Sequence, residues 1–202
     1  MARVTFVNSA RKDNPVAKKG ESYYHWTPFR SYKRYSKDRP RPSQLCSGRK
    51  SEVMATQEAL SDALESVESV DDIRSACEMA AEEFRQQAEE YTDSADNMPE
   101  NFQDGDQCNS MREMAESIEA AADELEGLDF DAPDPFADDE PEEPTMSQYG
   151  NGEDYEVAFD EWDSEHEQWE AQKSDSDDEI EQHFEQLKED AQSASDNIEF
   201  MF

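Results

Sequence analysis

Apolar residues recur every three or four positions between residues 51 and 128, a spacing that places them on one face of an α-helix. Three such stripes predict three helices. They comprise Val53, Leu60, Leu64 and Val67; then Ile73, Cys77, Ala80, Phe84, Ala88, Tyr91, Ala95 and Met98; then Cys108, Met111, Ala115, Ile118, Ala122 and Leu125. Short connections favour antiparallel neighbours, so we predict an antiparallel three-helix bundle over residues 51–128.

The ends of these helices also have sequence signals. Ser69, followed three residues later by Asp72, predicts a capped start for the second helix. Pro99 predicts its end, and Gly127 predicts the end of the third helix. The small Ala and Cys residues in the stripes would allow the helices to approach closely.

A different pattern precedes the bundle. Aromatic residues alternate with polar and basic residues over residues 18–37, which predicts a β-hairpin that turns near residues 27–31. Pro28 suits the turn better than a central strand, and residues 4–7 also have strand composition. We therefore predict a small β-hairpin module over residues 1–50. It should pack on another part of the chain, because a lone hairpin is marginally stable in water.

The third region, residues 129–152, predicts an acidic linker. Residues 129–144 hold four prolines, eight acidic residues and no basic residue, so the segment should stay extended, solvated and disordered. Helical periodicity returns over residues 153–202, in two stripes that predict two amphipathic helices and a C-terminal tail. The stripes are Tyr155, Phe159, Trp162, His166 and Trp169, then Ile180, Phe184, Leu187, Ala191 and Ala194. Acidic residues at 175–178 suit the start of the second helix.

Composition adds partial disorder to this mainly α architecture. Only 34% of the residues are hydrophobic and 35% are charged, a balance that limits how much apolar surface can be buried. The charge is also divided along the chain. Residues 1–50 carry 13 Lys and Arg against 3 Asp and Glu, a formal charge of +10, whereas residues 51–202 carry −45. Such opposite blocks must bind either different partners or each other.

The basic block holds the candidate binding residues. Aromatic rings interleaved with cations can stack on bases and neutralise phosphates, which points to a nucleic acid or another anionic partner. The candidate partner-binding residues are Tyr23, Tyr24, Trp26, Arg30, Lys33, Arg34, Tyr35, Arg39 and Arg41. The alternative is that the alternating aromatics form the buried face of the hairpin.

The C-terminus offers a second candidate, a docking motif formed by Ile198, Phe200 and Phe202. This acidic end with apolar residues resembles the C-terminal tips of bacterial and phage single-stranded-DNA-binding proteins, which recruit partner proteins. The resemblance covers fewer than ten residues.

Catalysis and cofactor chemistry have little support. The sequence contains no GxGxxG, P-loop, GxSxG or HExxH motif, so we predict no enzyme, no catalytic residue and no cofactor. The three cysteines are widely spaced and include no CxxC, which argues against a metal site or a disulfide framework and is typical of a reducing compartment. No apolar run approaches the ~20 residues of a membrane span. We therefore expect a cytoplasmic protein.

Much of residues 8–130 resembles a group of uncharacterised bacteriophage proteins. The matching segments are Ala10-Arg11-Lys12-Asp13, Lys18-Lys19-Gly20-Glu21-Ser22-Tyr23-Tyr24, Trp26, Phe29-Arg30, Tyr35-Ser36-Lys37, Pro40-Arg41-Pro42-Ser43-Gln44-Leu45, Ala122-Asp123-Glu124-Leu125-Glu126 and Leu128-Asp129-Phe130. The resemblance implies a phage or prophage origin and a location in the host cytoplasm, but no activity. The segment at residues 18–23 is also similar to short treble-clef zinc modules. The cysteine pair of those modules is missing, so we expect no zinc.

Together these features predict a non-enzymatic phage accessory protein that acts as an interaction module. The basic arm would bind an anionic partner, nucleic acid included, and the acidic region would regulate it or recruit a host or phage protein. The alternative function is an acidic DNA mimic that inhibits a host nucleic-acid-binding defence or restriction factor. The oligomeric state stays open, because the helix seam could also pair between chains as a coiled-coil dimer.

Overall fold

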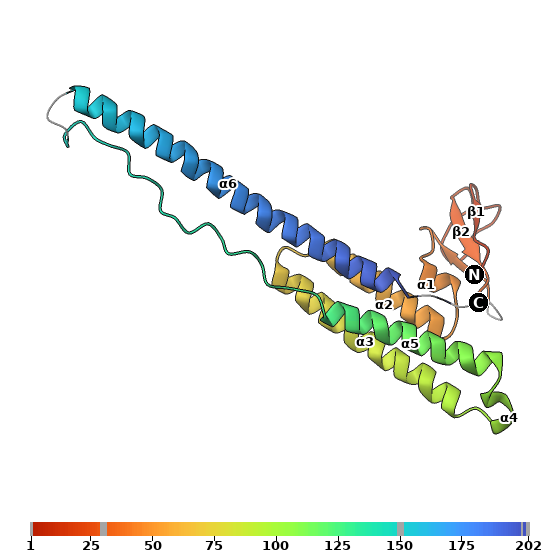
Figure 1. Ribbon diagram of the computed structural model, residues 1–202. Helices are drawn as coiled ribbons and strands as arrows, with labels where there is room; N and C mark the ends of the chain where they lie inside the picture. The colour runs from red at the N-terminus through yellow and green to blue at the C-terminus, as the bar shows by residue number, and fades with distance from the viewer. Residues whose placement is uncertain (1, 29–31, 149–151, 199, 201–202) are drawn as a thin grey trace. The chain divides into compact units, whose positions relative to one another are not determined.

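The computed structural model describes residues 2–28, 32–148, 152–198 and 200 (Figure 1). The chain is mainly helical with a small antiparallel sheet at its N-terminus, so the predicted fold class is confirmed. The elements are β1 (Thr5–Val7), β2 (Tyr23–Trp26), β3 (Arg34–Ser36), α1 (Pro42–Leu45), α2 (Arg49–Leu64), α3 (Val70–Asp96), α4 (Glu100–Gln103), α5 (Asp106–Glu126) and α6 (Gly152–Asp196). They form two compact units, one of Met1–Leu128 with Asp190–Phe202 and one of Asp129–Glu189.

The N-terminal sheet has the strand order β1-β2-β3, and both pairs are antiparallel. Strands β2 and β3 are the predicted hairpin, with His25 opposite Tyr35 and Trp26 opposite Arg34. The predicted turn includes residues 29–31, which lie outside the described residues. Strand β1 adds a third strand through the segment that had strand composition, with Phe6 opposite Tyr24.

The sheet is tied to the helices through α1. The indole Nε1 of Trp26 donates a hydrogen bond of 2.8 Å to the carbonyl oxygen of Gln44, and Trp26 is only 4% exposed. The backbone N–H and the hydroxyl of Ser43 both donate to the carboxylate of Glu58 on α2, at 2.8 and 2.7 Å. Residues 42–45 thus form a short helical turn within the region that was predicted as a β-hairpin module.

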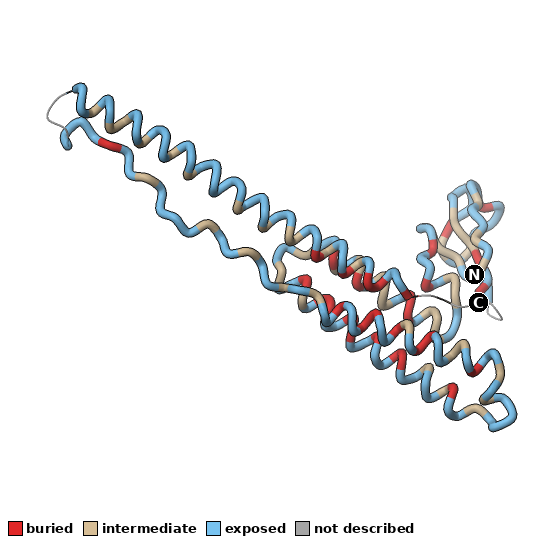
Figure 2. The backbone as a smooth tube through the Cα atoms, in the orientation of Figure 1, coloured by how far each residue is buried: buried red, intermediate tan, exposed pale blue. Residues whose placement is uncertain are grey.

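Helices α2, α3 and α5 run antiparallel to their neighbours (Figure 1) and bury most of the predicted stripe residues (Figure 2). The stripe residues Val67, Tyr91, Met98 and Met111 are only half-buried, and Val67 and Met98 lie beyond the ends of α2 and α3. The fully buried large side chains include Val53, Ile73, Phe84, Ile118 and Leu125. Replacing a buried Phe by Ala in such a core typically costs ~3–5 kcal/mol, so Phe84 is a major anchor of the bundle.

The predicted start of α3 is confirmed. The hydroxyl oxygen of Ser69 accepts a hydrogen bond of 3.2 Å from the backbone N–H of Asp72, and the Ser69 hydroxyl donates at 2.7 Å to the Asp72 carboxylate. This arrangement satisfies one of the N–H groups that every helix start leaves without an intrahelical partner. The hydroxyl donor also lowers the pKa of Asp72.

The bundle unit contains a further element from the end of the chain. Ala191, Ala194, Ser195 and Ile198 are all buried, and the Nε2 of Gln57 on α2 donates a 2.6 Å hydrogen bond to the carbonyl oxygen of Ser195. The last turns of α6 therefore complete the core that we expected from three helices alone.

Residues 152–196 form one continuous helix, where we expected two. The prediction of a second start at residues 175–178 was wrong because no Gly or Pro interrupts the helix after Gly152. Acidic residues and serines are tolerated inside helices at a cost well below that of Gly or Pro.

Within the second unit, the linker lies against α6. The indole Nε1 of Trp162 donates to the carbonyl oxygen of Pro141 at 3.0 Å, and that of Trp169 donates to the carbonyl oxygen of Asp138 at 2.9 Å. The Phe136 and Trp169 rings meet edge to face, 5.8 Å apart. We expected the linker to be solvated and disordered along its length, but these contacts hold its central part on the aromatic face of α6.

Candidate anion-binding cleft

A cleft of about 470 Å³ lies on the N-terminal module. Its walls come from the β1–β2 connection, the end of β2, strand β3 and helix α1. The lining residues are Pro15, Val16, Trp26, Lys33, Arg34, Tyr35, Ser36 and Gln44. Four of the predicted partner-binding residues are therefore brought together: Trp26, Lys33, Arg34 and Tyr35.

The wall contributed by the β1–β2 connection is shaped by Asn14. Its side-chain Oδ1 accepts hydrogen bonds from the backbone N–H groups of Val16 and Ala17, at 3.0 and 2.8 Å, and this Asx-type turn positions Pro15 and Val16. Gly20 then reverses the chain with a φ of 98°, in a region that glycine adopts without steric cost. The connection is thus an ordered part of the module.

The cations of the cleft are exposed. Lys33 places its Nζ 5.5 Å from the centroid of the Tyr35 ring, and Arg34 lies opposite Trp26 in the sheet. Neither cation takes part in an ion pair within the described residues. Burial and then the charge of Lys33 lower the pKa of the neighbouring His25, which is the direction expected beside a positive charge.

The aromatic side chains have mixed roles. Trp26 is almost fully buried and its Nε1 already bonds to Gln44, so its main role is to hold the sheet on α1. Tyr35 is half-buried and contacts Tyr23 at 6.0 Å between ring centroids. Tyr24 contacts Phe6 at 4.8 Å, and neither Tyr23 nor Tyr24 lines the cleft.

The remaining predicted cations lie elsewhere. Arg39 is exposed and does not line the cleft. Arg41 pairs with Asp62 on α2, a contact that raises the pKa of the guanidinium. Arg30 lies outside the described residues.

Three cations of the module form ion pairs with carboxylates in the described residues. Lys37 pairs with Glu21 at 3.3 Å, Arg41 pairs with Asp62, and Arg49 pairs with Glu90 at 3.4 Å. Several other exposed cations have no ion pair within the parts of the chain that the structure describes. These are Arg3, Arg11, Lys12, Lys18, Lys19, Lys33, Arg34 and Arg39. Within the described residues, these eight cations are therefore available to an anionic partner.

The predicted C-terminal docking motif is not displayed as a free tip. Ile198 is 4% exposed and belongs to the core of the bundle unit. The ring of Phe200 lies beneath the Nζ of Lys50, 4.7 Å from the ring centroid. Phe202 lies outside the described residues.

Sequence reasoning missed Pro15, Val16, Ser36 and Gln44 as lining residues. Asn14 before Pro15 is a turn signal, but nothing local in the sequence places that turn beside β3. Among the described residues, no group of three or more His, Cys, Asp or Glu side chains is arranged to hold a metal ion.

Over the same residues, no helix combines the length and the apolar character required to cross a membrane. Comparison with known proteins adds no relative: no protein-family model, no curated protein and no solved structure matches the chain.

Proposed function

We propose that this protein is a non-enzymatic phage accessory protein whose N-terminal module binds an anionic partner, with nucleic acid as the ligand to test first. The observation that carries the proposal is the cleft lined by Lys33, Arg34 and Tyr35, in which Lys33 lies over the Tyr35 ring and neither cation has an acidic partner in the described residues. Flexible cations beside aromatic faces suit single strands, because the cations neutralise phosphates while bases stack on rings.

The acidic remainder of the chain shapes this binding. Its formal charge of −45 repels a polyanion, whereas the module's +10 attracts it. Long-range repulsion is screened beyond a Debye length of ~10 Å at 0.1 M salt, and direct contacts are screened less. We therefore expect affinity to rise from very low salt to moderate salt and then to fall as counterions compete for the phosphates.

The test is fluorescence anisotropy of a labelled single-stranded oligonucleotide, titrated with the full chain over a salt series. The variant is Lys33→Glu and its matched control is Lys173→Glu. Both lysines lie over an aromatic ring, Lys33 over Tyr35 at 5.5 Å and Lys173 over Trp169 at 4.9 Å, and both changes alter the net charge equally. Lys33→Glu should weaken binding and reduce the salt slope by about 1, as expected for a lost phosphate contact.

Two outcomes would count against the proposal. If both variants weaken binding equally, the effect is one of net charge and the cleft is not the site. If the unmodified protein binds neither single-stranded nor duplex DNA or RNA, nucleic acid is the wrong ligand.

We further propose that the acidic region regulates this binding. Deleting residues 129–202 would be an unsuitable test, because Ala191, Ala194 and Ile198 belong to the bundle core. Replacing the exposed Glu161, Glu165 and Glu170 of α6 by Gln leaves that core intact. The regulatory role requires tighter oligonucleotide binding by this variant at low salt, and unchanged affinity would disprove it.

The second candidate function, an acidic DNA mimic, is favoured by the charge of α6. This helix of 45 residues holds 18 Asp and Glu against two Lys. At ~1.5 Å per residue, its net charge amounts to about one negative charge per ~4 Å. One strand of DNA carries one charge per ~3.4 Å. The mimic would capture a host DNA-binding protein in competition with DNA. A pull-down from host lysate that returns no nucleic-acid-binding protein would refute it.

A further inference from the structure

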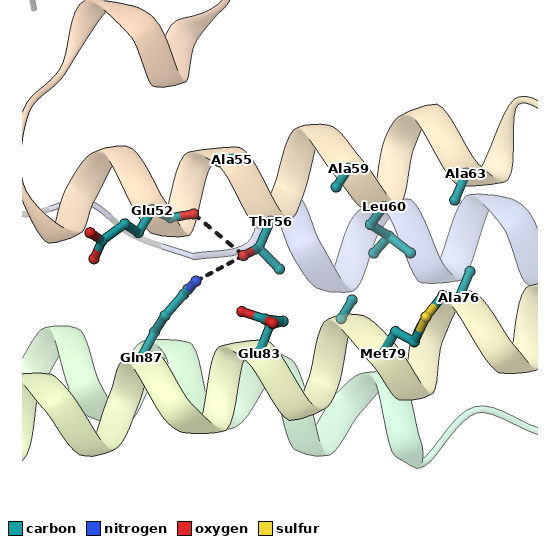
Figure 3. A pocket seen from close by; sticks show the side chains of 11 residues that line it. Glu52, Ala55, Thr56, Ala59, Leu60, Ala63, Ala76, Met79, Glu83 and Gln87 are labelled. Atoms are coloured by element: carbon teal, nitrogen blue, oxygen red, sulfur yellow. Dashed lines mark hydrogen bonds between the residues drawn. The ribbon is translucent and has the colours of Figure 1, made fainter.

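A second hollow, separate from the basic cleft, lies between α2 and α3 on the acidic bundle (Figure 3). It is a groove of about 510 Å³. One end is apolar and the other is polar, as the labelled side chains in Figure 3 show. The groove is open to solvent. Acidic side chains are common among the other exposed residues of these helices.

The apolar end is lined by small side chains of α2 and by a methionine of α3. Ala55, Ala59 and Ala63 recur every four residues and so form one ridge of α2. Met79 stands on the α3 side with 64% of its surface exposed. Small ridge residues permit a third helix to approach closely, because interhelical distance depends on the side chains at the contact.

The polar end contains a buried acceptor without a partner. Gln87 is only 8% exposed. Its Nε2 donates a hydrogen bond of 2.8 Å to the hydroxyl oxygen of Thr56, which in turn donates to the carbonyl oxygen of Glu52 at 3.3 Å. The Gln87 Oε1 has no hydrogen-bond partner among the described residues. Such groups are rarely left unsatisfied. This oxygen is itself closed to solvent, so a ligand in the groove meets the charged side chains at this end instead.

The charge at the polar end of the groove determines whether a cationic or an anionic ligand is favoured. Glu52 from α2 and Glu83 from α3 both line the groove, and neither forms an ion pair within the described part of the chain. These two carboxylates favour a cationic ligand in the groove over an anionic one. A second copy that offered its own acidic helices would instead bring like charges together.

We propose that this groove is a docking site for a basic amphipathic helix of a partner protein. A Lys or Arg of the partner lies at the Glu52 and Glu83 end of the groove, and apolar residues two turns away cover the Ala59–Ala63 end beside Met79. The spacing follows from the groove, because Thr56 and Ala63 are seven residues, or ~10 Å, apart on α2. The site is independent of the basic cleft.

The probe is a fluorescently labelled synthetic helix of about 18 residues with leucines on one face and an arginine two turns from them. Two control peptides are used. One carries Glu in place of the basic residues of the probe, and the other carries Gln in place of its leucines. Binding to the full chain is measured by anisotropy and mapped by amide chemical shifts. We expect shifts in α2 and α3 with the basic peptide, and at least about tenfold weaker binding of either control peptide, a factor equivalent to ~1.4 kcal/mol.

The protein variant is Ala59→Gln, which fills the groove without changing the charge. Its matched control is Ala120→Gln on α5, another exposed helical alanine, which does not line the groove. A second variant, Met79→Ser, removes apolar surface at an exposed position and so should leave the fold intact. We expect Ala59→Gln and Met79→Ser to weaken the peptide at least about tenfold and Ala120→Gln to leave affinity within about twofold.

Several results would overturn this proposal. Equal binding of the Glu-containing peptide would exclude the charge argument, and equal affinities of Ala59→Gln and Ala120→Gln would place the peptide elsewhere. Self-association of the protein without peptide, abolished by Ala59→Gln in sedimentation experiments, would instead assign the groove to a second copy of this chain.

Discussion

The continuity of α6 predicts that proline cannot be introduced at its centre. Ser176 is the position to test, because it lies within Gly152–Asp196 and inside the acidic segment where a second helix was expected to start. In a helix interior, proline lacks the N–H that bonds to the carbonyl four residues earlier, and its ring clashes with that carbonyl. In a helix with Asp175 as its N-cap, residue 176 would be the first helical position, where proline is favourable.

The size of the effect follows from helix energetics. Proline is ~3 kcal/mol less favourable than alanine inside a helix. That difference corresponds to roughly a hundredfold shift in the local opening equilibrium, since each 1.4 kcal/mol is about a factor of ten. No aromatic contact and no linker hydrogen bond of α6 involves residues 174–179 among the described residues, so packing should not offset the loss.

The assay is hydrogen exchange of the full chain, followed by mass spectrometry of peptides that cover residues 165–185. Ser176→Pro should exchange roughly a hundredfold faster there than the matched Ser176→Ala variant. Peptides from α3 and α5, which belong to the other compact unit, should be unchanged. If Ser176→Pro and Ser176→Ala exchange alike, α6 is two helices and the reasoning is refuted.

Two further predictions concern the bundle unit. Trp26→Phe removes the hydrogen bond to the Gln44 carbonyl and should lower the free energy of unfolding in urea by about 1 kcal/mol. Tyr24→Phe, which removes a hydroxyl without a hydrogen-bond partner in the described residues, should change it by less than about 0.5 kcal/mol, and equal losses would contradict the anchoring role of Trp26. Burial raises the pKa of the Cys77 thiol from 9.0 to about 11, so the unfolded chain should lose this proton first and stability should fall as pH rises from 9 to 11. Cys77→Ala should flatten that slope in urea midpoints measured over the same pH range, and an unchanged slope would contradict this assignment.

The periodic part of the fold could be predicted because it depends on local pattern. The stripe of α3 marked Ile73, Phe84 and Ala95 as core residues, and all three are fully buried. Ser69 marked the start of that helix through a hydrogen bond to a residue only three positions away. Such signals are read correctly because the interacting groups are neighbours in the sequence.

The features that were missed depend on contacts between distant segments. Phe136 meets Trp169 and Gln57 meets Ser195, pairs separated by more than thirty positions, and no local pattern links them. The cleft was only half predicted for the same reason: its cations and Tyr35 belong to one hairpin, whereas Pro15 reaches it through the turn at Asn14.

The distribution of ion pairs bears on both proposed binding sites. Outside residues 1–50 the chain has only five Lys and Arg, and each one contacts a carboxylate or an aromatic ring. They are Arg74, Arg85, Arg112, Lys173 and Lys188. Residues 51–202 also hold fifty acidic residues, so such pairing is expected. At exposed sites each ion pair contributes only ~0–1 kcal/mol to stability.

The module differs because its cations are numerous and its acids are few. Arg41 and Arg49 pair with carboxylates of α2 and α3, whereas Lys33 and Arg34 form no ion pair within the described residues, so an anion that binds at Lys33 and Arg34 has no such ion pair to break. Binding there should therefore be separable from folding: Lys33→Glu should change affinity while leaving the urea midpoint within error. The same logic applies to Glu52 and Glu83 on the bundle, which form no ion pair among the described residues. Charge of both signs is thus left available, on two surfaces that can be tested independently.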